Sequence, residues 1–439
     1  MKISRLTQAL AVSFPAIILA SCADMTGSSV ADTSDIPVEL LQPKNYSVGS
    51  GTPDQLAALA AKHNPSIVAL RHRAERMKAQ APQAASLPDP MASVSAGSMA
   101  ETAAGQMQGM VGVSQKIPLP GKRDAASRAA LHEAAAISSD ADALALKISE
   151  QVKSAWWDYY LAEKTISYTK ENRSLLLSIS DIVSARIESD SASQADKLRT
   201  ENEITLLDRD LADLQKLRSS AIARINSLLN RPAGSSLPPT KEPSLPATSS
   251  LEGLIARAQK NHPDITAARQ RVDAFNQRLR KAKLERFPDP TVGLSYAPID
   301  DSGLSRMANG RDQVFATLGF NIPLWREPRK AMVREATEGI AETKALLESS
   351  RADIRYRVED AYFRAKTARE VTTLFKDRLI PSAKQASEVT LTGYSAGKSS
   401  FTDVIATQRD ILTYQLQLVK SRAELGKAIA TLEAAAAIQ

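Results

Sequence analysis

Two long stretches of the chain, residues 122–231 and 329–438, are predicted to be helical, and in the later part of each the apolar residues follow one another at spacings of three and four. That spacing is typical of helices that bury one stripe, and the first stretch contains no Gly or Pro. Short polar runs at 189–193 and 393–400 interrupt the two stretches, so each is predicted to be a helical hairpin. The predicted contact stripes are Ile204, Leu207, Leu211, Leu214, Ala221, Ile225 and Leu228 in the first hairpin, and Ile411, Tyr414, Leu418, Leu425, Ala428 and Leu432 in the second.

Shorter segments alternate apolar residues with small or polar ones, which is the pattern of strands with one apolar face. The pattern is clearest over 291–297 and 313–322, and weaker over 91–99 and 107–117. Polar loops separate the strands of each pair, so each pair is predicted to form a hairpin. The alternation in the last strand places Val314, Ala316, Leu318, Phe320 and Ile322 on one side and Phe315, Thr317, Gly319 and Asn321 on the other.

A further helix is predicted before each strand pair, over 53–81 in the first half and 251–285 in the second. Each of these helices ends before a Pro-Asp-Pro sequence, because proline lacks an amide hydrogen and stops a helix. The order of helix, strand pair and helical hairpin therefore occurs twice.

Sequence echoes in the same order indicate an internal duplication. Echoing segments are His63-Asn64-Pro65 and Asn261-His262-Pro263, Leu87-Pro88-Asp89-Pro90 and Phe287-Pro288-Asp289-Pro290, Ile117-Pro118-Leu119 and Ile322-Pro323-Leu324, and Ala155-Trp156-Trp157 and Ala361-Tyr362-Phe363. We assign a first repeat to residues 53–231 and a second to 251–439. A Pro- and Ser-rich linker, 232–250, joins them.

The predicted strands require assembly if their apolar faces meet lipid. Every backbone group must be paired inside a membrane, and strands achieve this only in closed barrels. Bacterial barrels begin at about eight strands, whereas one chain offers four. The predicted fold is therefore mainly α, with a membrane β-barrel portion that several copies of the chain build together.

The N-terminus has the pattern of an export signal. Residues 1–21 contain a basic start and an apolar run, and the run ends in Leu19-Ala20-Ser21-Cys22. This ending resembles a lipobox, which implies that Cys22 becomes the first mature residue and carries covalent lipid, including palmitate. Residues 22–52 would then be an anchored segment, and Ala23 after the cysteine favours sorting to the outer membrane. Because Cys22 is the single cysteine, a disulfide within one chain is excluded.

Composition and charge change this picture little. The formal charge is +7, but acidic residues lie between the basic ones along the helices, which indicates solvated surfaces and no nucleic-acid partner. The histidines (His63, His72, His132, His262) lack partners at metal-ligand spacing, so no metal site or cofactor is predicted. Catalytic motifs are not visible either, and the chain is predicted not to be an enzyme.

Together these features resemble the TolC-like family of outer-membrane efflux channels, over nearly the whole chain after Cys22. Segment 115–123, Gln-Lys-Ile-Pro-Leu-Pro-Gly-Lys-Arg, is similar to the strand-to-helix junction of the family's heavy-metal branch. Tyr394, Gly397 and Asp403 lie in a segment similar to the family's periplasmic mouth.

The resemblance implies a homotrimer with a twelve-stranded outer-membrane barrel and a twelve-helix periplasmic tunnel, and places 232–250 in an equatorial belt. It implies a periplasmic adaptor (a membrane fusion protein), an inner-membrane pump of the RND type, and heavy-metal cations as cargo. Tyr394, Gly397 and Asp403 would contact the adaptor, and copies of Asp403 would form an anionic ring. Two positions depart from the family pattern: Ala406 stands where some members carry a second acid, and Asp190 stands in the first tip where the second has Gly397.

Alternative functions remain open at this point. A drug-efflux or type I secretion duct would have the same fold. A lipid-anchored periplasmic adaptor would have one helical hairpin between compact β-domains, and a coiled-coil scaffold would lack the alternating strands.

Overall fold

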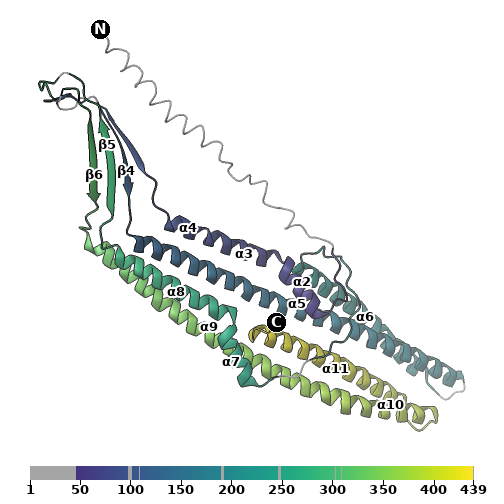
Figure 1. The fold of residues 1–439 in the computed structure, drawn as a ribbon. Helices are drawn as coiled ribbons and strands as arrows, with labels where there is room; N and C mark the ends of the chain where they lie inside the picture. Colours follow the sequence, from purple (N-terminus) through teal and green to yellow (C-terminus); the bar gives the residue numbers. More distant parts are fainter. Residues whose placement is uncertain are drawn as a thin grey trace. The chain divides into compact units, whose positions relative to one another are not determined.

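Figure 1 shows the computed structural model of the protein, which describes residues 46–96, 101–107, 109–188, 192–245, 249–301, 303–307 and 309–438. The predicted signal peptide, Cys22 and most of the anchored segment lie outside the described residues, as does Asp190. From residue 46 onward, long helices extend from a four-stranded sheet at one end to two hairpin tips at the other (Figure 1).

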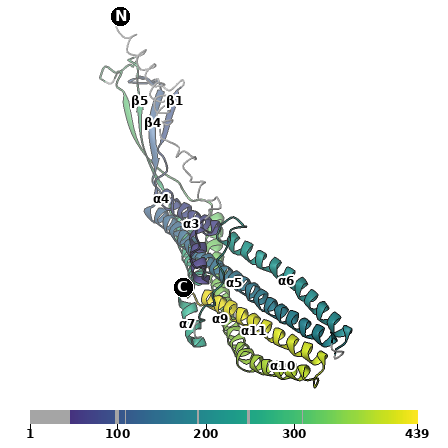
Figure 2. The same cartoon turned by 90° about the vertical axis from the view of Figure 1, so that its right-hand side faces the viewer.

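Two helical hairpins make up most of the structure. The first consists of α5 (Pro120–Glu188) and α6 (Gln194–Leu228), and the second of α9 (Arg326–Leu374), η3 (Phe375–Leu379), α10 (Ile380–Ser395) and α11 (Phe401–Ala435). Helix α5 packs against both α6 and α11, so the hairpins lie side by side (Figure 2). The predicted stripe of α6 is confirmed, since Leu207 and Ile225 are buried while the neighbouring Leu206 is exposed.

The second hairpin differs from the continuous helix that its spacing predicts. Residues Phe375–Leu379 form a turn of π-helix, followed at once by Ile380 and Pro381. Proline offers no amide hydrogen, and its ring collides with the carbonyl four residues earlier, so the helix widens there. The first hairpin contains no proline after Pro120, its first helical residue, and α5 remains α-helical from there to Glu188.

The helices before the strands are also more divided than predicted. The first half has α2 (Pro53–His63), α3 (Pro65–Lys78) and α4 (Gln80–Ala85), and the second has α7 (Leu251–Asn261) and α8 (Pro263–Leu284). Asn64 and His262 are extended because each precedes a proline, which disfavours the helical conformation. Both side chains cap the next helix: Ser66 N donates to Asn64 at 3.0 Å, and Asp264 N donates to His262 Nδ1 at 3.2 Å.

The four predicted strands form one antiparallel sheet. They are β1 (Met91–Ala96), β4 (Gly109–Lys116), β5 (Pro290–Ala297) and β6 (Gln313–Phe320), in the order β1-β4-β5-β6. The two halves meet between β4 and β5, where Val113 lies opposite Leu294. The connection between β1 and β4, predicted as a plain polar loop, contains a further short pair, β2 (Glu101–Thr102) and β3 (Gly105–Gln106).

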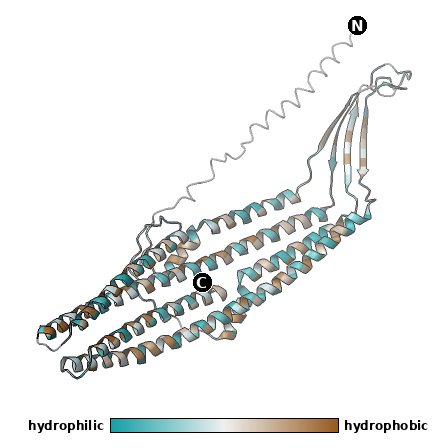
Figure 3. Cartoon of the chain, turned by 180° about the vertical axis from the view of Figure 1, so that it is seen from behind, coloured by the Kyte–Doolittle hydropathy of each residue, from teal (hydrophilic) through white to brown (hydrophobic). Residues whose placement is uncertain are grey.

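The pairing register sorts the strand side chains into two faces, and the sides predicted for 314–320 are confirmed. One face is mainly apolar, with Gln115 as a polar member at its end, and includes Ala92, Val94, Val111, Val113, Val292, Leu294, Tyr296, Val314, Ala316, Leu318 and Phe320. The other carries mainly small or polar residues, among them Ser93, Ser95, Gly112, Ser114, Gly293, Ser295 and Thr317. Val94, Leu294 and Leu318 are each at least 60% exposed, so the described part of the chain leaves the apolar face uncovered. Figure 3 shows that the long helices lie beyond the ends of the strands and do not pack on the sheet.

A hydrophobic cluster around Trp156 lies midway along the hairpins. It joins Leu56 of α2, Ile225 of α6, Val419 of α11 and Leu237 of the linker. Gly426 of α11 allows the close approach, because a Cβ there would lie 1.9 Å from the Trp157 ring. The cluster therefore holds both hairpins and the linker together.

Charged contacts fix the linker beside this cluster. Arg218, which interrupts the apolar stripe of α6, lies 3.1 Å from the Glu163 carboxylate. Thr240 of the linker donates its amide to the same carboxylate at 2.9 Å. Burial, together with the hydrogen bond to Glu163, raises the pKa of Tyr159 to about 12.

Candidate functional site

The tip of the second hairpin is a tight chain reversal that requires a glycine. Gly397 has a φ of 72°, and its N–H donates to the Tyr394 carbonyl at 3.0 Å. Lys398 N donates to the Gly393 carbonyl at 2.7 Å, which completes a Schellman motif after α10. No neighbouring atom lies within 4 Å of a Cβ placed on Gly397, so the glycine serves the backbone conformation and leaves this point of the tip open.

Tyr394 fastens this tip to the first hairpin. Its side chain is buried, and the Arg186 guanidinium of α5 lies 4.3 Å from the ring centroid. Arg186 also donates to the Tyr394 carbonyl, and the Phe401 ring packs at 5.9 Å. Burial raises the pKa of the Tyr394 phenol, whose oxygen has no hydrogen-bond partner within the described structure. In a single chain, Tyr394 is thus a packing residue of the tip.

Asp403 caps the helix that leaves the tip. Its carboxylate accepts hydrogen bonds from Ser400 N at 3.2 Å and Ser400 Oγ at 2.7 Å, and Asp403 N donates to Ser400 Oγ at 3.2 Å. This is a capping box at the start of α11. The Asp403 side chain is exposed, as is Ala406 one turn later.

Ion pairs between the hairpins continue the contact away from the tips. Arg409 of α11 pairs with Glu203 of α6, and Arg173 of α5 donates to Asp208 of α6 at 2.7 and 3.2 Å. These pairs, like Arg186 on Tyr394, were not found from the sequence, because their members lie far apart along the chain.

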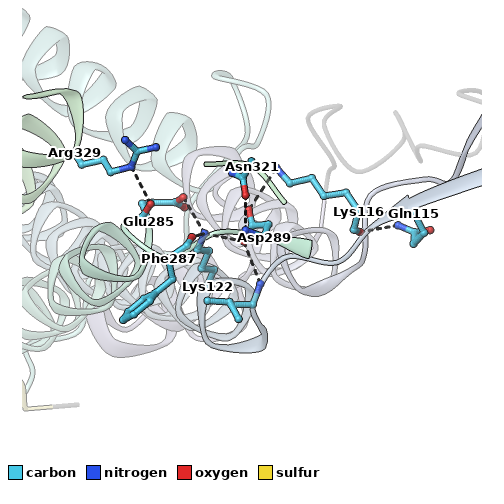
Figure 4. Close-up of polar contacts among 9 residues, drawn as sticks. Gln115, Lys116, Lys122, Glu285, Phe287, Asp289, Asn321 and Arg329 are labelled. Atoms are coloured by element: carbon cyan, nitrogen blue, oxygen red, sulfur yellow. Dashed lines mark hydrogen bonds and ion pairs between the residues drawn. The ribbon is translucent and has the colours of Figure 1, made fainter. Parts of the chain in front are cut away.

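A second polar cluster lies at the other end of the hairpins, where strands become helices (Figure 4). Lys122 Nζ lies 2.7 Å from Asp289 Oδ1, and both side chains are buried. The Lys122 ammonium also donates to the Phe287 carbonyl at 2.9 Å and lies 3.4 Å from Glu285 Oε2. This cluster joins the start of α5 to the segment between α8 and β5, and so connects the two halves.

Asp289 is the centre of the junction. Besides Lys122, it accepts the Leu119 amide at 3.3 Å and lies 3.4 Å from Lys116 Nζ. Burial alone would raise the pKa of Asp289, but the hydrogen bonds from Lys122 and Leu119 outweigh that effect and hold it below its ordinary value. The sequence pointed to Asp289 as part of an echo and to Lys122 as part of a family-like segment, but it did not predict their contact.

The described residues contain no group of three or more His, Cys, Asp and Glu side chains that could hold a metal ion.

No helix within the described ranges is both long enough and apolar enough to cross a membrane.

Solved structures with the same fold include bacterial outer-membrane proteins. Outer membrane protein VceC of Vibrio cholerae has a TM-score of 0.71 and 19% identity, covering 88% of this chain and 95% of that chain. The MtrE outer membrane channel of Neisseria gonorrhoeae has a TM-score of 0.72 and 18% identity, covering 90% and 94%. CusC has a TM-score of 0.72 and 16% identity, covering 90% and 95%. Comparison with curated protein sequences gave no significant match.

Family membership rests on a sequence model that covers most of the chain. The model for outer membrane efflux proteins matches residues 56–231 and again 254–437. The two matched segments contain both helical hairpins and all four strands of the sheet. The chain therefore belongs to the outer membrane efflux protein family.

Proposed function

We propose that the chain is the passive exit duct of a tripartite efflux system, built as a lipid-anchored homotrimer in the outer membrane. The observation that carries this proposal is the sheet, which has an uncovered apolar face and continues directly into long helices. At 1.5 Å per residue, α5 alone is about 100 Å long, a length suited to crossing the periplasm.

Closure of the sheet supports the oligomer. Among the described residues, β1 and β6 each pair on one side only. Unpaired backbone edges are not tolerated in lipid, so strands of several copies would join into one barrel. Three copies give twelve strands, an even number within the range of bacterial barrels. Cys22 would add a covalent lipid anchor to each copy.

The partners follow from the same architecture. The hairpin tips, with Gly397 at the open point, would meet a periplasmic adaptor of the membrane fusion type. An RND-type pump in the inner membrane would supply the energy. The single-chain structure gives Tyr394 a packing role, so we assign the adaptor contact to the exposed residues around it.

We propose heavy-metal cations as the cargo, on the basis of segment 115–123. Deleting the gene should then sensitise the cell to some of copper, silver, zinc, cobalt and cadmium, but not to a panel of dyes and antibiotics. The measurement is growth at graded doses, with the full chain supplied on a plasmid as the control. Sensitivity to drugs alone would support the efflux duct but contradict the proposal that heavy metals are its cargo. Sensitivity to neither class of compound would count against the efflux role.

Asp403 is proposed to help close the periplasmic mouth. Replacing Asp403 with Ala should raise ion conductance in planar bilayers roughly twofold or more and weaken the preference for cations, because an anionic ring is removed. The matched control is Ser400→Ala, which breaks the same capping box at a cost of about 1 kcal/mol but leaves the carboxylate. Equal conductance changes in both variants would assign the effect to the helix cap and reject the ring.

A further inference from the structure

The pairing of β4 with β5, which we call the internal seam of the sheet, shows how a second copy of the chain would pair with the edge strands β1 and β6. Strands β4 and β5 come from different halves and pair with Gly112 opposite Ser295. The outer edges of β1 and β6 have no strand partner within the described structure. If the halves are equivalent, β6 of one copy and β1 of the next should pair as β4 and β5 do.

The equivalence of the halves can be followed residue by residue. Asp89 corresponds to Asp289 and Ile117 to Ile322, from the two sequence echoes. Counting from these anchors, Ser93 corresponds to Gly293 and Gly112 to Thr317.

The structure agrees with this counting. Ser93 lies opposite Gly112 in the first half, and their counterparts Gly293 and Thr317 lie opposite each other in the second.

The same counting gives the pairing between copies. The internal pair is Gly112 with Ser295, and the counterparts of these residues are Thr317 and Ser95. We propose that β6 of one copy pairs with β1 of the next in the register that places Ser95 opposite Thr317. This inference rests on the oligomeric duct proposed above, and it assigns the residues that meet at the seam.

The faces of the sheet support this register independently. With Ser95 opposite Thr317, Val94 lies opposite Leu318 and Ala92 opposite Phe320, and all four belong to the apolar face. A register shifted by one residue would place the apolar side chains of one strand on the same face as the small and polar side chains of the other. Such a mixed face is energetically unfavourable where it meets lipid. Val94, Leu318 and Phe320 are all more than half exposed in the single chain.

The segment that joins each half's last strand to its long helix also supports the proposed register. Inside the chain, Ile117 N donates to the Pro290 carbonyl at 2.8 Å and so extends the ladder past β4. The counterpart donor is Ile322 N and the counterpart acceptor is the Pro90 carbonyl of the next copy. Ile322 is 74% exposed in one chain, whereas Ile117 is partly buried, so the second junction is less covered than the first.

The two seams differ in their charges. Arg123 donates to the Ala85 carbonyl and Arg329 to the Glu285 carbonyl, so these arginines correspond. Pro328 is thus the counterpart of Lys122. Asn321 similarly replaces Lys116, and Asp89, the counterpart of Asp289, is exposed with no side-chain partner among the described residues. The proposed seam therefore retains the strand pairing without the buried ion pair.

Cysteine pairs test the register in the full chain in outer-membrane preparations. Directly opposed residues have Cα atoms about 4.5–5.5 Å apart, within the range of about 4.4–6.8 Å that a disulfide spans. Diagonal neighbours are about 7–8 Å apart. After oxidation, Ser95→Cys with Thr317→Cys should give covalent dimers and trimers on non-reducing gels. Ser93→Cys with Thr317→Cys should remain monomeric.

Controls separate the register from the assembly. Ser114→Cys with Gly293→Cys, a pair opposed within one chain, should form an internal disulfide without dimers. Each single-cysteine variant reports any disulfide that involves Cys22.

The outcomes distinguish the register from the duct. Dimers from the off-register pair instead would overturn the register. An oligomer on native gels that neither pair links, while the internal pair reacts, would reject the seam and retain the duct. A monomer on native gels would reject both.

Discussion

Replacing Asp289 with Asn is expected to lower the free energy of unfolding by about 3 kcal/mol, because it leaves the buried Lys122 ammonium without its nearest carboxylate. The lost contact is 2.7 Å long. The expected cost lies at the low end for a buried ion pair, since Glu285 remains 3.4 Å from the ammonium. Denaturant unfolding of the detergent-solubilised protein, followed by circular dichroism, measures the change.

The chain provides a matched control for this substitution. Asp89 lies in the echoing Pro-Asp-Pro sequence but is exposed and has no ion pair with any residue that the structure describes. Asp89→Asn should therefore change the unfolding free energy by no more than about 0.5 kcal/mol. Replacing both Lys122 and Asp289 with apolar residues should recover part of the loss, because neither charge is then buried alone. Equal effects at Asp89 and Asp289 would show that the ion pair is not the cause.

The same pair gives the stability a dependence on acid pH. The pKa of Asp289 is lower in the folded chain than its ordinary value, so the unfolded chain binds a proton more readily. The stabilisation is therefore complete above the ordinary carboxyl pKa of about 4 and is lost as the pH falls through the lower, folded value. In Asp289→Asn, this part of the acid dependence should be absent.

The sequence predicted the elements of the fold well where the spacing of apolar residues alone determines the structure and no proline interrupts it. The alternation over 313–322 gave the faces of β6 correctly, and the spacing from Ile204 to Leu228 gave the buried side of α6. The divisions at Asn64 and His262 were missed, although both precede a proline whose effect is known. Pro381 was missed in the same way, because the apolar spacing continues through it.

The candidate site was only partly accessible to sequence reasoning. Gly397 could be assigned to a chain reversal because glycine tolerates a positive φ. Asp403 has a local partner, Ser400, at capping-box spacing, and that signal was present in the sequence but not used. Arg186 on Tyr394 and Lys122 on Asp289 depend on how the hairpins pack, so no local pattern contains them.

Replacing Trp156 with Ala is expected to cost about 3–5 kcal/mol, comparable to or larger than the loss of the ion pair. The Trp156 side chain is 2% exposed, stacks on Tyr160 at 5.8 Å and donates its indole N–H to the Gly51 carbonyl at 2.8 Å. Its removal would open a cavity where both hairpins and the linker meet. Thermal unfolding in detergent measures the total effect.

A graded pair of variants separates packing from hydrogen bonding. Trp156→Phe keeps most of the ring contact but leaves the Gly51 carbonyl without its donor, which should cost about 1–3 kcal/mol. Phe363→Ala serves as the exposed control, since that ring is 55% exposed in the second half, and it should cost less than about 1 kcal/mol. Because Leu237 packs on the same cluster, Trp156→Ala should also make the linker after Arg231 more sensitive to protease. A large loss of stability with an unchanged cleavage rate in the linker would show that the cluster stabilises the hairpins alone, and that the hydrogen bond from Thr240 to Glu163, which also pairs with Arg218, is sufficient to hold the linker.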